Sequence, residues 1–244
     1  MILASLPSSA RRVAALGCVA LLIAGCGSSG GTPAPLASAS GPGTTNAPSS
    51  PPYTLGPAPS ASPNDNCPTA APAAFTGTAT VTMTTNYGDM VIKVDGSLGA
   101  NAAGSFVALA RCGYYNNIIF HRILPGAVIQ AGDGTNARLP NLNPDFMGTG
   151  GVTWTIKDDK VTATYKTGTL AMANTGTADT GGSQFFIILS EAAFASYPKT
   201  YSIFGTVTKG MDVAQRIGLI PVAGDQGSTP TNIAVITSTT VVTP

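Results

Sequence analysis

Charged side chains are scarce in this chain: 9% of its 244 residues are Asp, Glu, Lys or Arg, and 12 basic residues face 11 acidic ones. A typical soluble domain has about 25% charged residues. Because there is no basic excess, the sequence carries no electrostatic signature of a nucleic-acid partner. It also has a single histidine, His121, which excludes a metal site built from several histidines.

A long hydrophobic run is also missing, since the apolar residues 13–23 are too few to span a bilayer. They follow Arg11 and Arg12 and end in small residues before Cys26, which resembles a bacterial lipobox. The pattern predicts a lipoprotein signal peptide over residues 1–25 and acylation of Cys26, with an ordinary secretory signal as the alternative. Cleavage leaves 10 basic and 11 acidic residues, so lipid rather than charge would hold the protein at the outer face of the cell membrane.

Large apolar side chains are nearly absent from residues 27–74. Eleven of the 19 prolines lie there, no Lys or Arg does, and 43 of the 48 positions are Pro, Gly, Ser, Thr, Ala or Asn. Such a segment cannot offset the entropy of ordering its backbone. We therefore predict a disordered tether over residues 26–74 and one folded domain over residues 75–244.

Cysteine is rare as well, with four in the chain. Cys18 lies in the predicted signal peptide and Cys26 is the predicted anchor, which leaves Cys67 and Cys112. These two either pair in a disulfide, as an oxidising compartment permits, or remain free thiols.

From residue 78 onward, apolar and polar residues alternate in short runs separated by Gly, Asn and Asp, which predicts β-strands. Helical spacing of apolar residues occurs only near residues 102–110 and 211–217. The pattern favours a mainly β fold: a closed eight-stranded antiparallel barrel capped by two α-helices. After a hairpin over residues 78–94, the predicted strands are 118–123, 128–131, 152–156, 169–173, 184–189, 203–207 and 233–242.

Two long motifs resemble those of a known family. The first is FHRILPG at 120–126 followed by VIQAGD at 128–133, and the second is LAMAN at 170–174 followed by GSQFFI at 182–187. Weaker matches are GTGG at 148–151 and YSIFG at 201–205. Together they resemble the cyclophilins, which are peptidyl-prolyl isomerases, over roughly residues 75–242. The resemblance implies an eight-stranded barrel with two helices and no cofactor.

The resemblance also implies roles for individual residues. Arg122 would bind the prolyl carbonyl and approach the imide nitrogen, because a planar, permanently charged donor suits a twisted amide. Gln130 and Asn174 would hydrogen-bond the peptide backbone beside Arg122. The expected substrate-binding residues are Ala127, Val128, Gly148, Ala173, Gln184, Phe186 and Tyr201.

Each assignment has a structural alternative. Arg122 in an apolar strand can form a buried ion pair with Asp133. Phe186 can be an ordinary core residue, and Gln130 and Asn174 can belong to a strand edge or a turn. His121 is expected to be structural, because isomerisation needs no general base.

The chain departs from the family pattern around the proline pocket. Ala127 stands where the family commonly has Phe, which predicts weaker binding unless another ring fills the gap. The usual Trp is absent, and Phe194 or Tyr197 is its nearest substitute. Tyr201 and Thr175 replace the common His and Ala.

The sequence therefore predicts an isomerase of exported proteins, acting on proline-containing unfolded or extended polypeptides. The alternative is a catalytically weak peptide-binding module or holdase of the same fold. A structural or carbohydrate-binding barrel has little support. We expect a monomer that meets the membrane only through its lipid.

Overall fold

The computed structural model describes residues 66–224 and 227–244. The predicted signal peptide, Cys26 and the tether up to residue 65 lie outside these residues. Residues 66–74, the last part of the predicted tether, contain neither helix nor strand. Among the described helices, none has the length and apolar character needed to cross a membrane.

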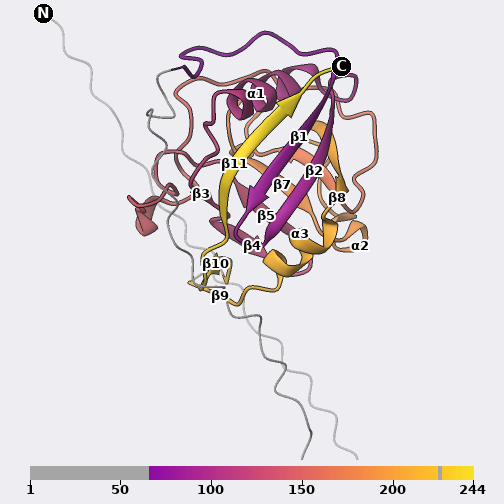
Figure 1. The fold of residues 1–244 in the computed structure, drawn as a ribbon. Helices are drawn as coiled ribbons and strands as arrows, with labels where there is room; N and C mark the ends of the chain where they lie inside the picture. Colours follow the sequence, from indigo (N-terminus) through magenta and orange to yellow (C-terminus); the bar gives the residue numbers. More distant parts are fainter. Residues whose placement is uncertain (1–65, 225–226) are drawn as a thin grey trace, which may run out of the picture. The chain divides into compact units, whose positions relative to one another are not determined.

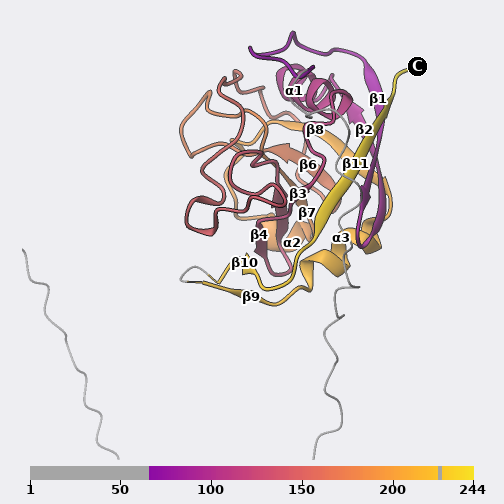
Figure 2. The ribbon, with the colours of Figure 1, turned by 60° about the vertical axis from the view of Figure 1, so that its left-hand side comes forward.

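The domain is built on one antiparallel sheet of nine strands in the order β3-β11-β1-β2-β8-β6-β7-β5-β4. The edge strands β3 (Ile118–Ile119) and β4 (Arg122–Leu124) are separated by only two residues, so the sheet curls back on itself (Figures 1 and 2). The predicted mainly β, barrel-like fold is confirmed. The other strands are β1 (Thr78–Thr85), β2 (Gly88–Asp95), β5 (Val128–Ala131), β6 (Thr169–Met172), β7 (Phe185–Ile188), β8 (Ile203–Lys209) and β11 (Val235–Val242).

Alternation of side chains explains the strands. In β1 the residues Ala79, Val81 and Met83 are buried while the threonines between them are not, and β2 repeats the pattern opposite it. Successive side chains in a strand point to opposite faces, so one face of this hairpin covers the core. The single run predicted at 118–123 becomes two short strands, β3 and β4, which pair with β11 and β5 respectively.

Two helices lie at opposite ends of the curled sheet (Figures 1 and 2). Helix α1 (Ala100–Arg111) buries Phe106 in a cluster of rings with Tyr115, Phe185 and Phe204, at centroid distances of 4.9 to 5.2 Å. Its first backbone N–H groups, on residues 101 and 102, donate to the carboxylate of Asp159 at 3.1 and 2.9 Å. A distant loop therefore caps this helix in place of a local side chain.

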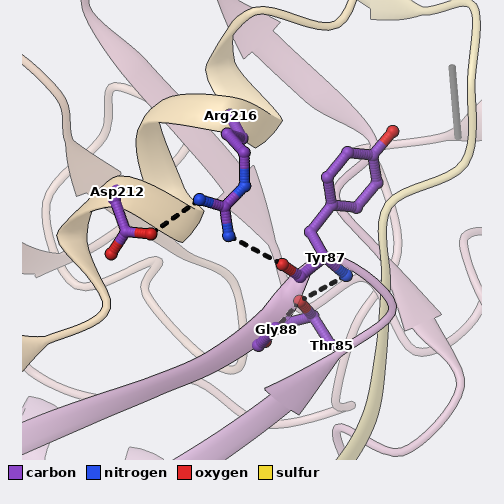
Figure 3. A network of polar contacts seen from close by, with 5 residues as sticks. All are labelled: Thr85, Tyr87, Gly88, Asp212 and Arg216. Carbon is purple, nitrogen blue, oxygen red and sulfur yellow. Dashed lines mark hydrogen bonds and ion pairs between the residues drawn. The ribbon is translucent and has the colours of Figure 1, made fainter. Parts of the chain in front are cut away.

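Helix α3 (Met211–Gly218) is fixed to the β1–β2 turn by Arg216. Figure 3 shows its guanidinium between Asp212, at 2.6 Å, and the backbone oxygen of Tyr87, at 3.0 Å. In the same turn, the Thr85 hydroxyl accepts from the Tyr87 N–H and donates to the Gly88 oxygen. The helix and the hairpin thus hold each other in place.

A helical turn, α2 (Glu191–Phe194), and the small sheet of β9 (Val222–Ala223) and β10 (Thr229–Pro230) were not predicted.

The prediction of a strand at 152–156 is wrong. These residues form only one bridge, between Ile156 and Gly181, and belong to the long connection from β5 to β6. Val152, Trp154 and Ile156 nevertheless pack against the core. The alternation therefore reflects full or partial burial of every second residue, which a packed loop can provide without a neighbouring strand.

A disulfide joins Cys67 to Cys112, with the two Cα atoms 5.2 Å apart. The Trp154 indole N–H donates to the Pro68 oxygen at 3.2 Å. The described domain therefore begins at a point that is covalently fixed to the end of α1.

Candidate active site

The register of three neighbouring strands brings the first site residues together. Arg122 on β4 pairs with Gln130 on β5, and Gln130 pairs in turn with Phe186 on β7. Side chains of directly paired residues lie on the same face of a sheet. A cation, an amide and an aromatic ring therefore form one row across the strands.

This row lies in a cavity of about 750 Å³. Of the ten residues assigned to catalysis or substrate binding from the sequence, eight line it: Arg122, Val128, Gln130, Gly148, Ala173, Asn174, Phe186 and Tyr201. Gln184 lines a neighbouring cavity of about 570 Å³. Lining residues that the sequence reasoning missed include Leu124, Met147 and Thr149; the last two lie in the long β5–β6 connection, beside Gly148, which the GTGG motif did indicate.

A chain of hydrogen bonds orients Arg122. Its Nη1 donates to Gln130 Oε1 at 3.3 Å, and Gln130 Nε2 donates to Gln184 Oε1 at 2.9 Å. Gln184 Nε2 then donates to two backbone oxygens, those of Gly148 at 2.9 Å and Gly150 at 2.7 Å. A carbonyl oxygen can accept hydrogen bonds but cannot donate them, so the two backbone oxygens require Gln184 Nε2 on their side, and this fixes which way the Gln184 and Gln130 amides face. The last acceptor in the chain, Gln130 Oε1, therefore points at the guanidinium.

Arg122 has no ion pair with a carboxylate among the described residues. The alternative of a buried pair with Asp133 is wrong, because the Asp133 oxygens accept backbone N–H groups instead. The positive charge of Arg122 is thus not neutralised by a neighbouring acid and remains able to bind an external acceptor.

His121, next to Arg122, is only 4% exposed. Burial lowers its pKa to about 4, and the nearby charge of Arg122 acts in the same direction, while Asp133 opposes both. The imidazole is therefore neutral near pH 7. A group with so low a pKa is a poor general base, which agrees with the structural role expected for His121.

Asn174 is placed at the cavity, but its side chain serves the protein itself. Its Nδ2 donates to the Thr200 oxygen at 3.1 Å, and its Oδ1 accepts from the Gly176 N–H at 3.1 Å. Asn174 thereby ties its own loop to the segment before Tyr201. Asn174 still lines the cavity, and its amide keeps one N–H and one lone pair, so its binding to the peptide backbone stays a prediction.

Ala127 does not line the cavity. It is 9% exposed and packs in a cluster that includes Val128, Phe186 and Phe194. Its assignment as a substrate-contacting residue therefore does not agree with the geometry. Phe194 belongs to this cluster and Tyr201 packs against it, so aromatic side chains gather in the same buried region as Ala127.

These side chains come from α2 and the residues after it. Phe194 is 2% exposed, lies 5.5 Å from the Phe186 ring and stacks on Tyr197 at 4.3 Å with an interplanar angle of 2°. The Tyr201 ring meets Phe186 edge-on at 5.2 Å. We call Phe186, Phe194, Tyr197 and Tyr201, which all line the cavity, the aromatic wall.

Within residues 66–224 and 227–244, no three or more His, Cys, Asp or Glu side chains come together in a group that could hold a metal ion. What the site offers is a guanidinium beside an apolar, ring-lined surface. This arrangement suits a ligand that has a carbonyl oxygen next to a compact apolar ring.

Comparison with known proteins gives a consistent result. Residues 80–241 match the family described as cyclophilin type peptidyl-prolyl cis-trans isomerase/CLD. A peptidyl-prolyl cis-trans isomerase-like 1 of Aspergillus oryzae is 36% identical over 150 residues, or 59% of this chain and 85% of the relative. Peptidyl-prolyl cis-trans isomerase A of Dickeya dadantii is 30% identical over 176 residues, or 69% of this chain and 87% of the relative.

Solved structures agree. A cyclophilin type peptidyl-prolyl cis-trans isomerase of Cryptosporidium parvum superposes with a TM-score of 0.57 at 28% identity, covering 68% of this chain and 99% of that one. A structure of the same protein in the presence of the dipeptide Ala-Pro gives a TM-score of 0.56. The family match covers most of the described domain and both motifs that form the row on β4, β5 and β7, so the chain belongs to the cyclophilin-type peptidyl-prolyl cis-trans isomerases.

Proposed function

We propose that this protein accelerates cis-trans isomerisation of X-Pro bonds in unfolded or extended exported polypeptides. The observation that carries the proposal is the environment of Arg122: an oriented guanidinium, without a carboxylate partner among the described residues, at a cavity lined by the aromatic wall. The cavity surface is suited to binding a proline ring, and the cation to binding the polar bond beside it.

The chemistry requires no bond to be broken. Rotation about an X-Pro bond has a barrier of about 18 to 20 kcal/mol, because conjugation gives the C–N bond partial double-bond character. In the twisted transition state the nitrogen has lost that conjugation, so its lone pair can accept a hydrogen bond. In the planar amide the lone pair is delocalised and does not accept one. The Arg122 guanidinium is the donor in this proposal, and the aromatic wall holds the ring while the preceding residue turns.

Substitution of Arg122 tests the proposal. We expect Arg122→Ala to lower kcat/KM for a short proline peptide at least ~100-fold, and Arg122→Lys to lose most of the activity because an ammonium lacks the planar fork. Arg111→Ala, which removes an exposed arginine at the end of α1, is the matched control. Near-normal turnover by a folded Arg122 variant contradicts the proposal. If the wild-type protein binds the peptide without turning it over, the holdase alternative is favoured.

We also propose that Cys26 carries the lipid and that the protein acts outside the cytoplasmic membrane. The small residues before Cys26 and the proline-rich tether after it support this, and the Cys67–Cys112 disulfide fits an oxidising compartment. Intact-mass measurement on protein from its native host tests it: acyl mass on an N-terminal Cys26 is expected, and Cys26→Ala must abolish it. A mature chain that begins elsewhere contradicts the anchor.

A further inference from the structure

Asp133 is a buried carboxylate with no part in the function proposed so far. It is 0% exposed. Its Oδ1 accepts the N–H groups of Thr135 at 3.0 Å and Asn136 at 2.8 Å. Its Oδ2 accepts those of Gly148 at 2.8 Å and Gly150 at 3.1 Å. Burying a carboxylate is costly unless its oxygens are well hydrogen-bonded, and four backbone donors satisfy this one.

The two bonds to Oδ2 fix the segment that orients the arginine. Gly148 and Gly150 donate to Asp133 through their N–H groups and accept from Gln184 Nε2 through their oxygens. Holding these peptide units in place also fixes the direction in which their oxygens point. The Asp133 carboxylate therefore fixes the two backbone oxygens that accept from Gln184. Gln184 in turn orients Gln130, and Gln130 orients Arg122.

The segment approaches the carboxylate so closely that side chains are excluded. A Cβ atom on Gly150 would lie 2.5 Å from Asp133 Oδ1, and Gly148 has a φ of +87°, in the left-handed region. Glycine tolerates both conditions, whereas other residues would push the backbone away from Asp133. The glycines of the GTGG segment thus allow its backbone to lie close enough to hydrogen-bond the Asp133 carboxylate.

We propose that Asp133 is a positioning residue for Arg122, acting through the Gly148 and Gly150 backbone oxygens and the amides of Gln184 and Gln130. It does not contact the cavity itself. Its effect on turnover rests on the proposed function, but its effect on the orientation of Arg122 does not. A residue that merely stabilised the fold would leave the Arg122 side chain as rigid as before in every molecule that stays folded.

Asp133→Asn is the principal variant, because an amide keeps the shape of the carboxylate but can accept at only one of its two atoms. We expect kcat for a proline peptide to fall about 10- to 50-fold with KM changed less than about 3-fold, since misplacement of a catalytic group acts mainly on the transition state. The NMR heteronuclear NOE of the Arg122 Nε–H should fall to values typical of a mobile side chain.

Asp159→Asn is the matched control. Asp159 accepts two backbone N–H groups, which belong to α1 and lie outside the relay to Arg122. This variant should lose less stability than Asp133→Asn, because Asp133 accepts four such groups, while kcat and the Arg122 NOE stay at wild-type values. The proposal is overturned if kcat falls equally in both variants. It is also overturned if Asp133→Asn keeps a rigid Arg122 and a normal kcat.

Gln184→Leu tests the relay if Asp133→Asn does not fold. A leucine at 184 can neither donate to the Gly148 and Gly150 oxygens nor accept from Gln130 Nε2, so the relay between Asp133 and Arg122 is broken. Loss of Arg122 rigidity in this variant supports the relay, and an unchanged NOE overturns it. If wild-type protein shows no turnover at all, the proposed function fails, while the Arg122 NOE still tests the positioning.

Discussion

Restoring the phenylalanine that the family commonly has at position 127 should harm this protein. Ala127 is 9% exposed and packs in the same cluster as Phe194, which is itself 2% exposed. We expect a phenyl ring added at this buried position to displace Phe194 of the same cluster, and with it Tyr197, which stacks on Phe194 at 4.3 Å.

The size of the effect follows from packing. Forcing extra carbon atoms into a filled core typically costs about 1 to 3 kcal/mol. If Phe194 and Tyr197 shift, the wall loses part of its apolar contact with proline, worth about 0.7 to 2 kcal/mol, or roughly 3- to 30-fold in kcat/KM. We therefore expect Ala127→Phe to lower both the stability and the specificity constant.

The assay is isomerisation of a short proline peptide, together with urea unfolding of each variant. Ala70→Phe adds the same ring at an exposed position and should change neither quantity. Adding Phe194→Ala to Ala127→Phe should restore part of the loss by making room for the new ring. A rise in kcat/KM with Ala127→Phe alone would refute the reasoning, because it would mean that the wall is incomplete without a ring at 127.

Two further predictions concern stability. The folded-state pKa of His121, about 4, is below its ordinary value of 6.5, so neutral His121 stabilises the fold above pH 6.5 and this stability is lost as the pH falls toward 4. Between pH 7 and pH 5 the loss is about 2 kcal/mol. Urea unfolding should show this loss for the wild type but not for His121→Gln, and equal pH dependence would contradict it. Breaking the Cys67–Cys112 bond, which closes a loop of 45 residues, should lower the free energy of unfolding by up to about 4 kcal/mol. The midpoint of thermal unfolding with and without reductant, compared with the Cys67→Ser/Cys112→Ser double variant, measures it.

Local patterns in the sequence determined much of the fold. Alternation predicted the β1–β2 hairpin, and helical spacing predicted α1 and α3, because these features depend on neighbours within a few residues. The motifs at 120–133 and 170–187 determined the family, and the resemblance predicted Arg122 as a catalytic residue. The same reasoning failed at residues 152–156, where alternating burial occurs without strand pairing.

Tertiary structure alone decided how the site is assembled. The sequence left Arg122 between a catalytic role and a pair with Asp133, and only the path of the β5–β6 connection showed that Asp133 binds backbone N–H groups of Gly148 and Gly150 instead. Likewise, only the fold showed that Ala127 is buried in a cluster with Phe194, on which Tyr197 stacks. The pattern that predicts a strand lies within a few neighbouring residues. Contacts between residues tens of positions apart depend instead on strand register and on the path of the loops, and both are determined by packing of the whole domain.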